Sequence, residues 1–127
     1  MTTKTTIFVW VLRLLFAALF LFAGFMKVTS QPMMVAEFDV VGLGQWFRFL
    51  TGGLELLGAV TLLVPRASAL GALLLLLVDL GAFVAQVTVL HVDWIHTVVI
   101  GLLLAVLVYL QRESLKARGS RRVPAGA

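Results

Sequence analysis

The chain has 127 residues, of which 61% are hydrophobic and 13% charged, and its mean hydropathy is +1.09. Soluble domains carry about 25% charged residues, so this composition excludes them and indicates an integral membrane protein. Cysteine is absent, which excludes disulfides, thiolate metal sites and a dithiol relay within the chain. Because a membrane helix needs about 20 apolar residues, the length allows four spans, which we place within residues 1–111.

The first predicted span covers residues 7–28. Its apolar stretch is longer than the core of a cleaved signal peptide, which has about 7–15 residues, and Arg13 interrupts it, so we expect a retained helix. Residues 31–42 are too few and too polar to cross a membrane. Ser30 can cap a short helix with Pro32 in its first turn and Gly42 past its end, which predicts a helix lying in the interface.

Three further spans are predicted over residues 45–64, 67–90 and 94–111. Trp46, Trp94 and Tyr109 stand where aromatic belts form. The connection at Pro65 and Arg66 is very short, so the second and third spans should form an antiparallel hairpin. The predicted fold class is therefore all-α, an integral membrane four-helix bundle with a short interfacial helix between spans one and two.

Charge predicts the orientation. Residues 112–127 hold five basic side chains against Glu113 alone, namely Arg112, Lys116, Arg118, Arg121 and Arg122. A basic segment directly after an apolar span is typical of a cytoplasmic tail that touches anionic lipid, so we expect no nucleic acid partner. Placing Lys4 and Arg66 on the same side leaves Glu37, Asp39 and Asp93 outside, with both termini cytoplasmic.

Arg13, Glu55 and Asp79 lie deep inside three of these apolar segments. Near the centre of a membrane helix each costs roughly 2.5–3.5 kcal/mol, so they should face inward and find partners. Counted from the cytoplasmic boundary at 1.5 Å per residue, Arg13 and Glu55 come to about 10 and 15 Å. This similarity in depth predicts a structural ion pair between Arg13 and Glu55.

A second set of polar residues should lie nearer the outer face, and it comprises Lys27, Arg48, Asp79, Gln86 and His96. They follow helical stripes on their spans and could line a cavity with more positive than negative groups. Such a cavity would suit a small anionic or polar-headed ligand. The alternative is that these side chains satisfy one another and leave no void, fixing the registry of the bundle.

Metal and catalytic sites are not indicated. His91, Asp93 and His96 are ligand types close in sequence, but two histidines five residues apart do not share a helix face. No nucleophile and base, glycine-rich phosphate loop or haem-binding pair is present. We expect no cofactor within the chain, with a quinone or a lipid as the ligand classes left open.

The segment from Arg13 through Gly24 to Lys27 resembles the first helix of the DoxX and DoxX-like family of small bacterial membrane proteins. The likeness continues through the short helix ending at Gly42, the Gly53 to Gly58 stretch containing Glu55, and the Gly81-Ala82 pair. The resemblance implies a four-helix bundle in the bacterial inner membrane, with recurrent charged residues at Arg13, Lys27 and Glu55. The chain departs from the pattern at Gln86, where members often have His, and at Asp79, where many have an apolar residue.

Two functions of different classes follow. The first is a non-catalytic accessory or anchoring subunit of a larger membrane complex, as described for some family members in oxidoreductase assemblies, with other subunits or copies of itself as partners. The second is a protein that binds or transports a small anion or a quinone-like molecule in a cavity open to the outer face. An enzyme acting alone is disfavoured because the chain offers no evident source of electrons.

Overall fold

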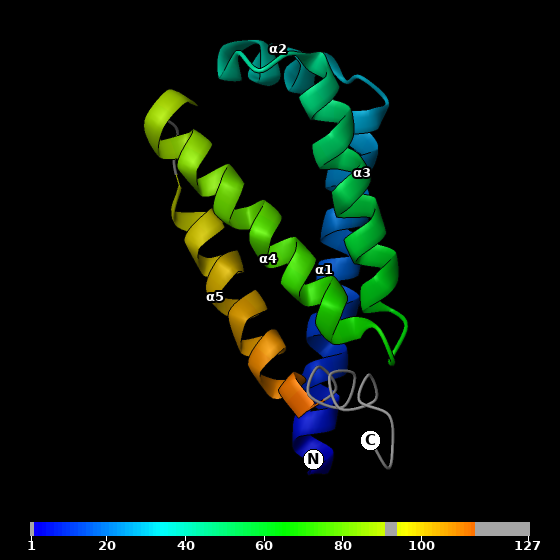
Figure 1. The fold of residues 1–127 in the computed structure, drawn as a ribbon. Helices are drawn as coiled ribbons and strands as arrows, with labels where there is room; N and C mark the ends of the chain where they lie inside the picture. The colour runs from blue at the N-terminus through cyan, green and yellow to red at the C-terminus, as the bar shows by residue number, and fades with distance from the viewer. Residues whose placement is uncertain (1, 91–93, 114–127) are drawn as a thin grey trace, which may run out of the picture.

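The computed structural model describes residues 2–90 and 94–113, and these residues are almost entirely helical (Figure 1). The elements in chain order are α1 (Thr3–Val28), α2 (Pro32–Val41), α3 (Gln45–Leu62), α4 (Ser68–Ala85), the π-helix η1 (Gln86–Leu90) and α5 (Ile95–Leu110). The predicted all-α class is confirmed. The turn at residues 91–93 and residues 114–127, most of the predicted tail, lie outside the described residues.

Local sequence accounts for the ends of the first two helices. The Thr2 hydroxyl accepts a hydrogen bond from the backbone N–H of Thr5 and so caps α1. Pro32 occupies the first turn of α2, where its missing N–H costs nothing. Gly42 ends α2 in a left-handed conformation with φ of 82°, and its N–H donates to the carbonyl of Phe38. The helix predicted over residues 31–42 is therefore present, with one residue fewer at each end.

The helices form two antiparallel pairs that converge at the end holding the N-terminus (Figure 1). α1 runs beside α3, α4 runs beside α5, and α3 meets α4 near their short connection. Toward the opposite end the two pairs diverge, and α2 lies across that end of α1 and α3.

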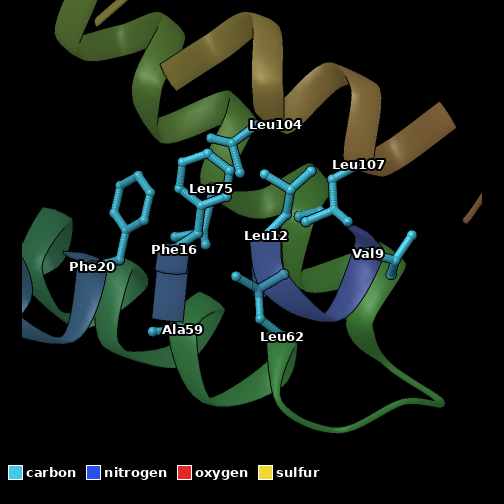
Figure 2. Close-up of a cluster of buried hydrophobic side chains, with 10 residues drawn as sticks. Val9, Leu12, Phe16, Phe20, Ala59, Leu62, Leu75, Leu104 and Leu107 are labelled. Atoms are coloured by element: carbon cyan, nitrogen blue, oxygen red, sulfur yellow. The ribbon is translucent and has the colours of Figure 1, made fainter. Parts of the chain in front are cut away.

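The apolar core fills the convergent half of the molecule (Figure 2). All four long helices contribute fully buried side chains, which include Phe16 of α1, Leu62 of α3, Leu75 of α4, and Leu104 and Leu107 of α5. Figure 2 shows these side chains directed toward one another between the helices. The convergent end is thus tightly packed, which fixes how the two pairs meet.

Glycines allow the helices of this core to approach closely. A Cβ atom added to Gly24 of α1 would lie 2.8 Å from the backbone oxygen of Gly52 in α3. A Cβ added to Gly71 of α4 would lie 2.9 Å from both the backbone oxygen of Gly58 and the backbone nitrogen of Leu62. Backbone atoms cannot yield as a flexible side chain can. These contacts are of the small-residue type by which membrane helices associate.

Two helical segments are long and apolar enough to cross a membrane by length and composition, Thr3–Val28 and Ser68–Leu90. α5 is apolar but shorter, with 16 residues. α3 has 18 residues but carries Gln45, Arg48 and Glu55, which lower its hydropathy. The charges of α3 therefore need compensation from neighbouring helices, which the site geometry supplies.

Gly71→Ala should destabilise the fold, because the added methyl group would meet backbone on the facing helix. Overpacking of this kind costs about 1–3 kcal/mol. Gly53→Ala is the matched control, since nothing lies within 4 Å of the Cβ position there. Thermal unfolding in detergent should show a midpoint several degrees lower for Gly71→Ala and no loss for Gly53→Ala. Equal midpoints would contradict the close α3–α4 approach.

Candidate functional site

A cavity of 620 Å³ lies between the two helix pairs, in the divergent half of the molecule. α1 and α3 form one wall, α4, η1 and α5 form the other, and α2 closes one end. Most of its lining is apolar, with Phe20, Leu54 and Leu74 as examples. A few polar side chains interrupt this surface, which is the usual character of a small-molecule site.

Lys27 and Glu55 form an ion pair across one wall of the cavity. The Lys27 Nζ and Glu55 Oε1 atoms are 2.8 Å apart, and the two side chains are 16% and 6% exposed. The Gly24–Gly52 contact sets this pairing, because it aligns the last turn of α1 with the middle of α3. Lys27 thereby satisfies the charge that would otherwise be isolated on α3.

The predicted Arg13–Glu55 pair is wrong. Arg13 instead donates from Nε and from a terminal nitrogen to Oε1 of Gln111, the Nε distance being 3.0 Å. Its guanidinium also lies 4.7 Å from the ring centre of Trp10. Arg13 precedes the Gly24 contact by eleven positions, about 16 Å along the helix, so it lies far from Glu55. Its contacts tie α1 to the end of α5 at the convergent end of the fold.

Arg48 does not line the cavity as predicted, although it is buried. Its guanidinium donates to the backbone oxygen of Lys27 and to Oε1 of Gln45, the latter at 2.7 Å. This carbonyl lies in the last turn of α1, where a cation is favoured, and it also accepts a hydrogen bond from a backbone N–H of the following turn. The amide of Gln45 in turn donates to Asp39 and to the Val35 carbonyl. Arg48 thus fastens α2 and α3 to the end of α1.

Asp79 lines the cavity and is 7% exposed. Its carboxylate lies over Gly101 of α5, where a Cβ atom would be only 2.6 Å from Oδ2. Within residues 2–90 and 94–113 no hydrogen bond or ion pair joins Asp79 to another side chain. Asp79 is therefore a buried acid whose place depends on the missing side chain of Gly101.

Gln86 and His96 line the cavity nearer to its α2 end. Gln86 is the first residue of η1, and its Oε1 accepts a hydrogen bond of 2.5 Å from the Thr97 hydroxyl. π-helical turns are rare and often occur at functional sites. The structure thus brings together Lys27, Asp79, Gln86 and His96 of the predicted set, and leaves Arg48 outside.

Sequence reasoning missed two residues that line the cavity and one that binds a residue of the predicted ion pair. Glu37 of α2 and Thr97 of α5 line the cavity, and Gln111 is the partner of Arg13. Gln111 could have been proposed, because it is a polar residue at the end of the fourth span at the depth of Arg13. The positions of Glu37 and Thr97 depend on how the helix pairs diverge, which no local pattern reveals.

No three His, Asp or Glu side chains among the described residues are grouped so that they could hold a metal ion. His91 and Asp93, two members of the set weighed from the sequence, lie outside these residues. The arrangement that the structure does describe is an apolar cavity with an internal ion pair on one wall and a buried acid on the other. It can bind and orient a small amphiphilic molecule.

The sequence model of the DoxX-like family matches residues 11–110 of the chain. The chain belongs to the DoxX-like family. No curated protein and no solved structure matches it significantly. The match includes every cavity-lining residue, so the site lies wholly within the DoxX-like domain. The predicted resemblance is thereby confirmed.

Lys27→Met should strongly destabilise this DoxX-like chain, because it leaves the buried Glu55 unpaired. Breaking a buried pair costs about 3–5 kcal/mol. Adding Glu55→Gln to Lys27→Met should recover much of that loss, and denaturant unfolding in a double-mutant cycle would measure the coupling. Arg13→Met combined with Glu55→Gln is the control and should be additive. Coupling in the Arg13 cycle and none in the Lys27 cycle would reinstate the pairing predicted from sequence.

Proposed function

We propose that the chain is a multi-pass protein of the bacterial inner membrane in which α1, α3, α4 with η1, and α5 cross the bilayer as a four-helix bundle. α2 then lies in the outer interface. The charges support this orientation, because Lys4, Arg66 and Arg112 belong to the convergent end while Glu37 and Asp39 lie on α2 at the other end. Both termini are cytoplasmic in this arrangement.

Single cysteines test the topology directly, since the natural sequence has none. Asp39→Cys should react with a membrane-impermeant maleimide added to spheroplasts, whereas Arg112→Cys should react only after the membrane is opened. Both residues are solvent-exposed or partly so in the structure, so labelling reports their side of the membrane. The reverse pattern would invert the proposed orientation.

Within this bundle the chain functions as a binding protein for a small amphiphilic molecule, which it holds or transfers between the helix pairs. The cavity of 620 Å³ carries this proposal. Ligand sites in proteins span about 300–1,000 Å³ and combine apolar walls with a few placed polar groups. No catalytic step is assigned to the chain.

The cavity lining supports entry from the bilayer. Leu19, Leu50 and Leu77 line the cavity and are also exposed on the outside of the helices. Leu19 and Leu77 lie near the middle of their spans, on α1 and α4, and Leu50 lies in the second turn of α3. An apolar molecule dissolved among the acyl chains could pass between α4 and the α1–α3 pair at this level. A lipid or a quinone-sized molecule could therefore enter from the bilayer, and a ligand could also enter from the outer face.

Filling the cavity provides the test. Ala82→Phe adds a ring at a lining position, and Ala105→Phe adds the same ring at an exposed position on α5 that does not line the cavity. Wild type and both variants would be purified in lipid nanodiscs, extracted with solvent and compared by mass spectrometry. We expect a small molecule that is enriched with wild type and Ala105→Phe and reduced at least tenfold with Ala82→Phe.

An accessory or anchoring subunit is the second candidate function. Gly53 supports it, because this glycine is exposed on the outer face of α3 and nothing lies within 4 Å of its Cβ position. A helix of another subunit could approach the backbone closely there. If the nanodisc extracts hold no enriched molecule and a membrane protein instead co-purifies in mild detergent and is lost with Gly53→Phe, the accessory function replaces the binding function.

A further inference from the structure

The charges that line the cavity are mainly negative. Three carboxylates, Glu37, Glu55 and Asp79, face it against the single lysine Lys27, and His96 is the other basic side chain among the described lining residues. The sequence predicted the opposite balance because the predicted set included Arg48 and left out Glu37 and Glu55. The structure places the Arg48 guanidinium against the Lys27 carbonyl and the Gln45 amide, and 4.2 Å from the ring centre of Phe49.

Lys27 offers little attraction for an anion. Its ammonium group lies 2.8 Å from Glu55, which neutralises it within the wall of the cavity. An anionic ligand would have to compete with a carboxylate already in place and would face the charges of Glu37 and Asp79. The small anion expected from the sequence is therefore disfavoured.

On the opposite wall, Asp79 is a buried acid without a hydrogen-bond or ion-pair partner among the described residues. It is more than nine-tenths buried, and in the described part of the chain it forms no hydrogen bond or ion pair. His96 also lines the cavity and forms no ion pair with Asp79. The neighbouring Gln86 and Thr97 are bonded to each other. An acid in such a position is costly in a membrane unless a cation or a hydrogen-bond donor compensates it.

We infer that the ligand class of this cavity is a lipophilic amine, a molecule with an apolar body and one ammonium group that Asp79 receives. This inference rests on the proposed binding function and specifies its ligand. Asp79 lies seven residues, about 10 Å along the helix, from Gln86, which lines the cavity nearer to α2. The ammonium group reaches Asp79, and the apolar body lies against the leucine and phenylalanine side chains of the walls.

Three probes of similar shape test the inference: the amine 2-(1-naphthyl)ethylamine, the alcohol 2-(1-naphthyl)ethanol and the anion 1-naphthaleneacetate. Binding to the full chain in nanodiscs of zwitterionic lipid would be measured by calorimetric titration, with empty nanodiscs subtracted. We expect the amine to bind at least tenfold more tightly than the alcohol, and the alcohol more tightly than the anion.

Two variants assign the preference to Asp79. Asp79→Asn should bring the amine and the alcohol to equal affinity, while retained binding of the alcohol shows that the cavity is still folded. Gly101→Ala keeps the acid but displaces its carboxylate, since the new methyl group would lie where Oδ2 now packs. It should weaken binding of the amine several-fold and leave the alcohol unchanged.

The possible outcomes distinguish a failure of the amine inference from a failure of the proposed binding function. Equal binding of the three probes, tightest binding of the anion, or an amine preference that survives Asp79→Asn would overturn the amine inference and leave the binding function standing. If none of the probes binds to wild type and the extracts of wild type and Ala82→Phe are identical, both the inference and the binding function are wrong.

Discussion

The contact between Gly24 and Gly52 is the constraint on which the rest of the structure depends. Because neither residue has a side chain, α1 and α3 approach until backbone meets backbone, which fixes their relative register as well as their distance. That register places Lys27 opposite Glu55, and it brings the end of α1 within reach of Arg48. Three charged side chains in apolar surroundings thus find partners as a result of one close approach.

Helix positions could be predicted from the sequence, whereas the partners of the charged residues could not. Pro32 and Gly42 determine α2 locally, and long apolar runs determine α1 and α4. The Arg13–Glu55 error arose because depth was counted from the ends of the spans. The actual register is set by where the glycines touch, and it places Glu55 nearer to Lys27 than to Arg13.

The residues that line the cavity could likewise be predicted only in part. Lys27, Asp79, Gln86 and His96 were identified because polar side chains on apolar helices must face inward, and they do line it. Its sign of charge was not predictable, because a buried arginine can face either a cavity or the end of a neighbouring helix. Arg48 faces the end of a neighbouring helix, where its guanidinium donates to a carbonyl of the last turn of α1. The lining is mainly negative because Arg48 lies outside it and because Glu37 and Glu55, which the predicted set did not include, belong to it.

Because the two helix pairs are packed together at the convergent end, a small change in the angle between them moves their far ends by a larger distance. The pairs pack together at this end through the buried side chains of Phe16, Leu62, Leu75 and Leu104. The hydrogen bond from Arg13 to Gln111 adds a polar contact there. α3 has 18 residues and is about 27 Å long, so a tilt of about 5° at the convergent end moves its far end by roughly 2 Å. A tilt of this size would change the width of the cavity by roughly 2 Å. A small change of angle in the core therefore produces a larger displacement at the divergent end, where the cavity lies.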